Sequence, residues 1–465
     1  MRQRRTHETR HCPEKQVIKV IEMNTEKNNC KESNKELLKY ISDAPSIFHA
    51  AAASAAMLEE AGYRYLREAD RWEIAPGGRY YTMRNASSVI AFTVAKEISN
   101  YKFRIAASHS DSPTYKIKAV PALSGPEGYV RLNVEAYGGM IDFTWLDRPL
   151  GMAGRVFVKN GQRVEARLYR ADNVLLIPSL AIHMNREVNK GMAFNRQVDL
   201  CPLFSAGALK AEDFTAFLAA GLGVDKEEIV SFDLYLVNMQ EGLIWGAAEE
   251  FISSPKLDDL QCAFTTLKGL LAAQPTDGVN VWCCFDNEEV GSNTRQGAMS
   301  TFLKECLKRI NAALGYDEED YYRAVAGSFL VSADNAHAVH PNHPEKTDAE
   351  NKCALNKGIV IKENASQKYT TDAMARAAMK AVCALAGQPC QVFANRSDAA
   401  GGSTLGNLSN TQVSLHAVDV GLPQLAMHSA YETAGAEDTY SAIQVFEKYY
   451  SAAIEMDEAA AVTVR

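Results

Sequence analysis

The sequence predicts an α/β protein whose mostly parallel, doubly covered sheet is interrupted by a β-rich insertion. Strand-like apolar segments alternate with amphipathic helical segments before residue 112 and again after residue 240. Between them, residues 113–239 consist of short alternating segments separated by glycine and asparagine turns. Acidic residues and histidines directly follow several of the apolar runs, as at the edge of an open α/β sheet. We therefore expect a discontinuous domain, 33–112 plus 240–465, with the insertion as a second domain.

The N-terminal region contains a tail and the first elements of the α/β domain. Residues 1–32 begin with a basic stretch, but no hydrophobic core of a signal peptide follows, so we expect a disordered tail. The apolar spacing within 33–63 predicts two helices. The apolar runs at 87–95 and 103–111 predict strands of the main sheet.

The insertion is predicted to be built mainly of strands. A small helix at 211–222 and a strand at 232–239 close it. The alternating segments that precede them are 118–123, 128–139, 153–170 and 173–184.

The rest of the chain returns to alternating helices and strands, which completes the sheet and its two covering layers. The predicted helices are 260–274, 299–315, 372–387 and 438–456. The predicted strands are 280–285, 327–334, 390–394 and 413–421.

Composition excludes several functional classes. The chain carries 49 Lys+Arg against 57 Asp+Glu, for a net charge of -8, so no basic surface for nucleic acid is expected. No apolar run approaches the roughly 20 residues that span a bilayer, so no membrane segment is expected. The ten cysteines show neither a disulfide framework nor zinc-ligand spacing, which favours reduced thiols and a cytoplasmic protein.

Five separate segments place histidines and carboxylates just past apolar runs. Each has an ordinary explanation alone: paired aspartates often cap a helix, and a glutamate pair often lies on a solvated rim. In this order they predict two divalent metal ions, each held by an imidazole and a carboxylate, with a third carboxylate bridging them. A glutamate outside the ligand set could then transfer protons. The residues are His109, Asp111, Asp258, Asp259, Glu288, Glu289, Asp334 and His428.

Long motifs in this order resemble the aspartyl aminopeptidase family, which consists of cytosolic exopeptidases with two zinc ions. The resemblance covers nearly the whole chain after residue 33. The motifs are "ASHSDSP", "YGGMIDFTWLDRPLGMAGRV", "IPSLAIHMNREVN", "SPKLDDL", "DNEEVGS", "SADNAHAVHPN", "KGIVIKENASQKY" and "GLPQLAMHS".

The resemblance implies a role for each site residue. His109 and Asp334 would hold one ion, Glu289 and His428 the other, and Asp258 would bridge them. Glu288 would be the general base, and Asp111 would orient His109. Zinc is the expected ion, although cobalt and manganese also suit carboxylate-rich sites.

The resemblance also implies an assembly and a substrate. The insertion would be a dimerisation domain, and the dimers would build a homododecamer. His183 would reach the neighbouring subunit's active site, and Lys362 would meet an acidic substrate side chain. From its place beside the glycine-rich run 399–406, Asp398 is a candidate contact for the substrate amine.

Three departures from the family pattern bear on specificity. Asp259 stands where the family has asparagine, Ser179 where it often has histidine, and Ala430-Tyr431 where it often has Ile-Arg. Tyr431 in place of a cation could reshape the substrate pocket. We thus expect an aminopeptidase acting on peptides with a free, acidic N-terminus. The alternatives are neutral or basic specificity, a deacylase or carboxypeptidase on the same metal scaffold, a scaffold protein without activity, and a metal-buffering shell.

Overall fold

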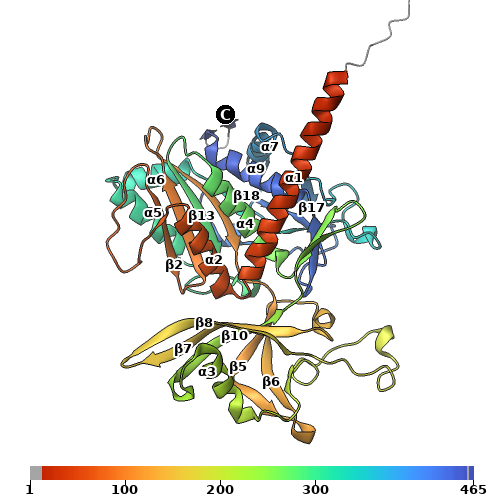
Figure 1. Cartoon of the computed structure of the whole chain (residues 1–465). Coiled ribbons are helices and arrows are strands. Elements are labelled where there is room, and N and C mark those ends of the chain that lie inside the picture. The colour runs from red at the N-terminus through yellow and green to blue at the C-terminus, as the bar shows by residue number, and fades with distance from the viewer. Residues whose placement is uncertain (1–12, 458–459) are drawn as a thin grey trace, which may run out of the picture.

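The computed structural model describes residues 13–457 and 460–465 and divides the chain into two units (Figure 1). The larger unit contains a nine-stranded sheet covered by helices. The smaller unit, built from the insertion, lies against one end of the larger. This arrangement confirms the predicted fold class.

The N-terminal helix α1 (Pro13–Asp43) corrects the expectation of a disordered tail over 1–32, of which residues 1–12 lie outside the described part. No glycine or proline follows Pro13 within the helix, so nothing in the backbone interrupts it. Its C-terminal half docks on the larger unit: Cys30 and Leu37 are buried, and the Asn34 amide donates to the Ala436 carbonyl at 2.7 Å.

The main sheet is mixed, with a parallel centre. Strands β13, β4, β14 and β18 run parallel, whereas β3, β2 and β16 introduce antiparallel pairs. The "mostly parallel" prediction therefore holds for the centre but not for the flanks. In spatial order the strands are β1 (Arg64–Tyr65), β2 (Arg79–Arg84), β3 (Ser88–Val94), β13 (Val279–Phe285), β4 (Phe103–His109), β14 (Phe329–Ala333), β18 (His416–Gly421), β16 (Ile359–Glu363) and β17 (Cys390–Ala394).

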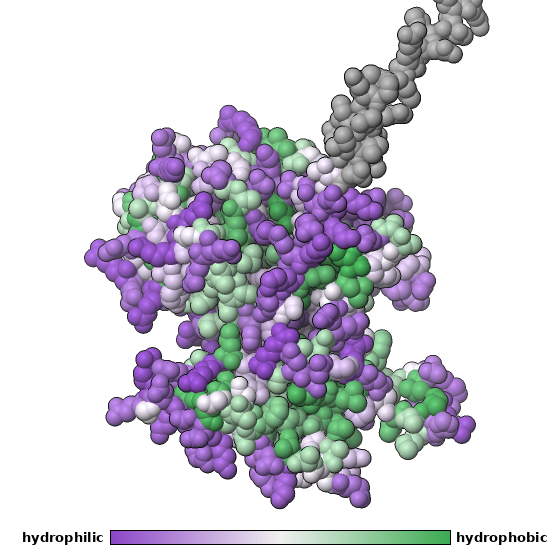
Figure 2. All heavy atoms as spheres, in the orientation of Figure 1, coloured by the Kyte–Doolittle hydropathy of each residue, from purple (hydrophilic) through white to green (hydrophobic). Residues whose placement is uncertain are grey.

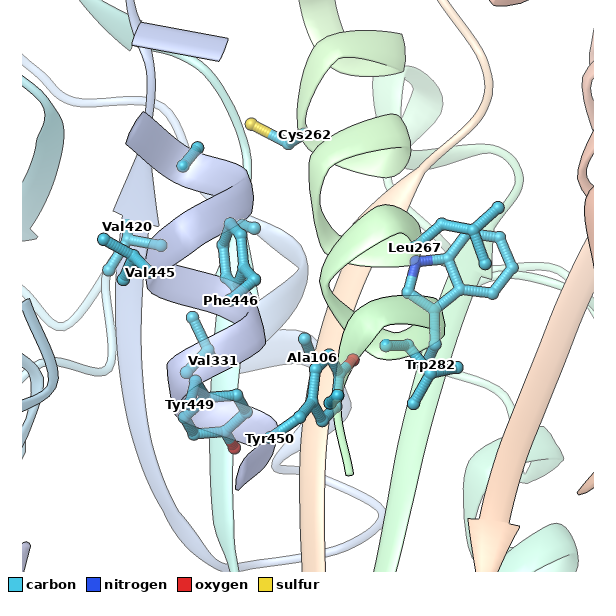
Figure 3. Close-up of a cluster of buried hydrophobic side chains, with 14 of the residues drawn as sticks. Ala106, Cys262, Leu267, Trp282, Val331, Val420, Val445, Phe446, Tyr449 and Tyr450 are labelled. Carbon is cyan, nitrogen blue, oxygen red and sulfur yellow. The ribbon is translucent and has the colours of Figure 1, made fainter. Parts of the chain in front are cut away.

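Helices cover both faces of this sheet because side chains alternate along the buried strands. On one face, Trp282 and Ala106 pack with Phe446 and Tyr449 between the sheet and two helices (Figure 3). The helices of that face are α2 (Ile47–Glu60), α4 (Leu257–Ala272), α7 (Ala373–Leu385) and α9 (Asp438–Ser451). Those of the other face are α5 (Phe302–Ala313), α6 (Glu318–Ala326) and α8 (Leu405–Ser409).

Two predicted helices are shorter in the structure. The segment 299–315 forms α5 over only part of its length. The predicted helix 438–456 is wrong at its end: α9 stops at Ser451, and β21 (Ile454–Asp457) pairs with β22 (Ala461–Val464). Ala452 has extended backbone angles, which end the helix and lead the chain into the hairpin.

The smaller unit is a six-stranded antiparallel sheet with helix α3 (Phe214–Leu222) packed on it. The predicted strand 173–184 is correct only to Leu175, and most of residues 176–202 form an exposed irregular segment. We call this smaller structure the β-rich unit. Its strands are β8 (Arg163–Leu175), β7 (Leu150–Asn160), β10 (Ile229–Asn238), β5 (Thr114–Ser124), β6 (Val130–Tyr137) and β9 (Leu203–Ser205).

A third, five-stranded sheet brings distant segments to one place. β12 leads into α4, β15 follows β14, and β19 and β20 flank the turn that carries His428. Its strands are β11 (Leu243–Trp245), β12 (Phe251–Ser254), β20 (Glu432–Gly435), β19 (Pro423–Leu425) and β15 (Ala336–His337). In the described part of the chain, no helix has the length and apolar character to cross a membrane.

Candidate metal centre

The five predicted metal-binding side chains converge at the carboxyl edge of the main sheet. His109 ends β4, Asp334 directly follows β14, and Asp258 lies in the first turn of α4. Glu289 lies in the 3-10 turn Glu288–Val290 after β13, and His428 lies in the turn between β19 and β20. The edge therefore collects one side chain from each of five segments, as expected for open α/β sheets.

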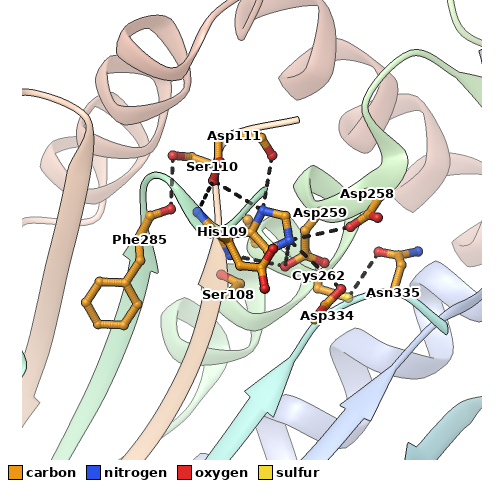
Figure 4. A network of polar contacts seen from close by, with 12 residues as sticks. Ser108, His109, Ser110, Asp111, Asp258, Asp259, Cys262, Phe285, Asp334 and Asn335 are labelled. Atoms are coloured by element: carbon orange, nitrogen blue, oxygen red, sulfur yellow. Dashed lines mark hydrogen bonds and ion pairs between the residues drawn. The ribbon is translucent and has the colours of Figure 1, made fainter. Parts of the chain in front are cut away.

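The Asp258 carboxylate lies between the two histidines. Its Oδ1 is 3.5 Å from His109 Nε2, and its Oδ2 is 3.4 Å from His428 Nε2. Each histidine has a second carboxylate of its own. His109 Nε2 is 3.9 Å from Asp334 Oδ1, and His428 Nε2 is 3.3 Å from Glu289 Oε1. Figure 4 shows the His109 half, with the acidic side chains gathered round one edge of the imidazole.

The donor atoms fit divalent cations. Ligand atoms of His109, Asp258 and Asp334 lie within 4.8 Å of one another, as do those of Asp258, Glu289 and His428. Asp258 Oδ1 and Glu289 Oε1 are buried and have no hydrogen-bond donor. Buried carboxylate oxygens without donors are costly unless a cation compensates them, and imidazole with carboxylate is a usual zinc donor set.

The charges within the cluster point the same way. Burial raises the pKa of Glu289 to about 7 and holds that of Glu288 well above its usual range. Burial opposes the charged form of His428, yet its contacts with Asp258 and Glu289 raise its pKa to about 11. Without a metal, protons must supply the positive charge that this cluster requires, so metal binding displaces protons.

The turns that carry the site residues adopt unusual backbone angles. Lys256, Asn287 and His428 have φ values of 58°, 65° and 65°. Residues other than glycine rarely enter this left-handed region, although asparagine and histidine do so more often than lysine, and such residues concentrate at functional sites. At Asn287 the turn directs Glu288 and Glu289 off the end of β13, so that two consecutive glutamates can both reach the site.

Asp111 links both halves of the site. His109 Nδ1 lies 3.1 Å from the Asp111 carbonyl and 3.4 Å from its carboxylate. The same carboxylate accepts the backbone N–H groups of Glu288 and Glu289, each at 3.1 Å. Asp111 therefore fixes the imidazole and the glutamate turn together, which is more than the orienting role that the sequence predicted.

Glu288 lies beside the five ligand candidates rather than among the closest contacts. Its carboxylate lies within 4.8 Å of ligand atoms of His109 and Glu289, and the side chain lines a cavity of about 520 Å³ with them. A half-buried carboxyl with a raised pKa at the wall of a cavity can accept and return a proton.

Sequence reasoning missed Glu432 and Tyr137, and it listed Asp259 among the clustered carboxylates and as a departure from the family pattern without giving it a role. Glu432 is buried and accepts the backbone N–H groups of Asp258 at 3.0 Å and His428 at 2.7 Å. Tyr137 donates to Asp111 at 2.7 Å, and the Asp259 carboxylate accepts the His109 N–H at 3.1 Å. The position of Glu432, four residues after His428, was the one available signal.

Lys362 lines the same cavity, but its ammonium group is already engaged. It is 3% exposed, and its Nζ donates to the carbonyls of Asp334 at 2.7 Å and Asn335 at 3.1 Å. It also lies 3.6 Å from the Asp334 carboxylate. In this structure Lys362 therefore supports the Asp334 segment.

The structure does not bring the other three predicted residues into the cavity. His183 lies in the exposed segment of the β-rich unit. Asp398 instead forms an exposed ion pair with Arg396 at 2.7 Å. The Tyr431 hydroxyl donates to the Glu241 carbonyl at 2.6 Å, so this ring extends toward the β11 side of the molecule.

Comparisons with known proteins identify the family of this chain. A profile of the family described as aminopeptidase I zinc metalloprotease (M18) matches residues 40–450. The probable M18 family aminopeptidase 2 of Clostridium novyi (strain NT) is 44% identical over 433 residues, covering 91% of this chain and all of that protein. Its namesake from Stutzerimonas stutzeri (strain A1501) is 38% identical, covering 91% and 99%.

Solved structures share the fold over most of their length. A chain in the cryo-EM structure of the Ape4 and Nbr1 complex matches with a TM-score of 0.88 and 34% identity, covering 91% of this chain and 86% of that chain. The S. cerevisiae mApe1 dodecamer matches with a TM-score of 0.81 and 26% identity, covering 91% and 97%.

Metal removal should destabilise the protein measurably. If zinc binds the folded cluster, where it would neutralise crowded carboxylates, chelation should lower Tm and zinc should restore it. At zinc concentrations about 100 times the Kd, the gain is about 2.7 kcal/mol. Asp258→Asn should lose most of this zinc-dependent shift in differential scanning calorimetry, whereas exposed Glu319→Gln should keep it. An equal shift in both variants would contradict a metal centre at Asp258.

Proposed function

Because this chain belongs to the M18 family of zinc aminopeptidases, we propose that it removes N-terminal residues, acidic ones foremost, by a two-metal mechanism. The observation that carries the proposal is the shared Asp258 carboxylate, which lies between two histidine–carboxylate pairs. One metal would need only one such pair. An acidic preference would make the chain an aspartyl aminopeptidase.

The side chains divide the chemistry among themselves. His109, Asp334, Asp258, Glu289 and His428 would hold two zinc ions, which polarise the substrate carbonyl and make water more acidic. Glu288 accepts a proton from the attacking water and returns it to the leaving peptide nitrogen. Asp111 keeps Glu288 and His109 in register through the hydrogen bonds described above.

Two observations bear on specificity. Lys362 is the one lysine or arginine among the described residues that line the cavity, which favours an acidic substrate side chain. Its engagement with Asp334 and Asn335 instead favours the second candidate, an aminopeptidase for neutral or basic N-termini. The two candidates share the metal chemistry and differ only in what Lys362 contacts when substrate is bound.

Assembly through the β-rich unit is also part of the proposal. Eleven of the seventeen exposed large hydrophobic side chains in the described residues lie between Val120 and Val230. Figure 2 shows apolar side chains gathered over that unit. A monomer rarely exposes so much apolar surface in one region. We propose that this unit dimerises, that His183 enters the partner's active site, and that the dimers form a dodecamer like the solved mApe1.

Replacing Glu288 by glutamine should separate metal binding from catalysis. Because Glu288 transfers the proton, Glu288→Gln should lower kcat by roughly 10²–10⁴-fold. Bound zinc, measured by mass spectrometry of the purified protein, should remain at the wild-type level. Glu319→Gln is the matched exposed control and should keep full activity. Wild-type turnover in Glu288→Gln would overturn the mechanism, and silence of the wild type with every metal would favour a scaffold.

Lys362→Met should distinguish the two specificities. If Lys362 meets the substrate carboxylate, kcat/KM should fall roughly 30-fold or more for Asp and Glu p-nitroanilides while those of Leu, Ala and Lys change little. If Lys362 only supports Asp334, all five substrates should lose activity together. Exposed Lys352→Met serves as control. A wild type that prefers Leu or Lys would reject acidic specificity and leave the metal chemistry intact.

The mass in solution tests the assembly. Light scattering should give a multiple of the 51.0 kDa chain mass. The pair Ile182→Asp and Met184→Asp should lower that mass and the activity together, because buried charges oppose association. A wild-type monomer with full activity would contradict both the assembly and the role of His183.

A further inference from the structure

The β-rich unit forms hydrogen bonds with the turn that carries His428. The Gly139 carbonyl lies 2.5 Å from His428 Nδ1, and the Ile141 N–H donates to the His428 carbonyl at 3.0 Å. Both Gly139 and Ile141 follow the last residue of β6. The ring nitrogen opposite the metal-facing Nε2 and the backbone of this histidine are thus held by the second unit.

Thr144 adds a contact with Ala430, two residues after His428. Its hydroxyl accepts the Ala430 N–H at 2.9 Å and donates to the Ile141 carbonyl at 2.7 Å. The Asn238 amide, at the end of β10, donates to the Ala430 carbonyl at 2.8 Å. Both backbone groups of Ala430 are therefore satisfied by the β-rich unit.

Glu289 is approached from the same side. Gly138 has a φ of +75°, and a Cβ there would meet Glu289 Cβ at 3.2 Å. Tyr137 donates to Asp111 Oδ2, the same oxygen that accepts the Glu289 N–H. The Tyr137–Gly139 segment therefore lies against both side chains of the His428–Glu289 pair.

The His109–Asp334 pair is held differently. The imidazole of His109 contacts Asp111, and the His109 N–H donates to Asp259. The Asp334 carbonyl accepts a hydrogen bond from the Lys362 ammonium group, and the Asp334 N–H donates to the Val420 carbonyl. All four partners belong to the larger unit.

We propose that the β-rich unit positions one specific metal-binding half of the centre, the His428–Glu289 half, with Thr144 as its main positioning residue. This inference rests on the proposed two-metal function. It makes affinity for one ion depend directly on the interface between the two units, while the direct hydrogen-bond partners of the other ion's ligands lie in the larger unit. Loosening the contacts at that interface should release the ion at His428 first.

Thr144→Val tests this with little change in size. The variant removes the hydroxyl that holds Ala430, so the turn and its imidazole lose their fixed orientation. Lost partners of a metal-bound imidazole lower affinity by about 10–100-fold. Bound zinc per chain, measured across a chelator series, should fall from two to one at about tenfold less chelator than in the wild type. Thr144→Ser keeps the hydroxyl and should restore the wild-type curve.

Thr114→Val is the matched control, since its hydroxyl donates to the Leu236 carbonyl within the β-rich unit. It should leave both ions in place. Gly138→Ala perturbs the same half through its contact with Glu289 and should also release the ion at His428 first. It replaces Thr144→Val as the test if that variant folds poorly. In a His428→Ala background, Thr144→Val should change nothing further, whereas in a His109→Ala background it should remove the remaining ion.

The outcomes are distinct. Simultaneous loss of both ions, loss of the His109 ion first, or a wild-type curve for both Thr144→Val and Gly138→Ala would overturn the positioning role. A wild type that binds a single ion under all conditions would instead refute the proposed two-metal function on which the inference rests.

Discussion

The site depends on one carboxylate that two imidazoles share. Asp258 is buried, and burial of a charged carboxylate is unfavourable unless positive charge lies close to it. His109 and His428 supply that charge in the metal-free protein and lower the pKa of Asp258 below its usual range. Much of the surrounding structure serves to hold these three groups together: the paired strand ends, the Glu432 carboxylate that accepts two backbone N–H groups, and the five-stranded sheet.

The central sheet and the convergence of the candidate ligands at its edge could be predicted from the sequence because both leave local signals. A buried strand reads as a continuous apolar run, and a polar residue directly after it lies at the sheet edge. His109, Glu289 and Asp334 were found in this way. The long ordered motifs then supplied roles that local patterns leave open.

Other features could not be predicted, because they depend on contacts between distant segments. The helix over residues 13–32 was not predicted because the sequence there has no strong apolar periodicity. The C-terminal half of α1 is stabilised by docking on the larger unit through Asn34. Tyr431 was assigned to the substrate pocket because it stands where the family often has a cation, whereas its hydroxyl donates to the Glu241 carbonyl. Lys362 looked free in "IVIKEN", but the carbonyls of Asp334 and Asn335, which follow β14, accept its hydrogen bonds.

The turn at His428 has a consequence for how the protein matures. Its imidazole meets Gly139, which lies 289 residues earlier in the chain, and its backbone N–H meets Glu432, four residues later. The His428 side of the cluster is therefore complete only after nearly the whole polypeptide has been synthesised and the two units have docked. Under the proposed two-metal function, zinc would enter that position only late in biogenesis, and a prematurely terminated or half-folded chain would lack the second ion.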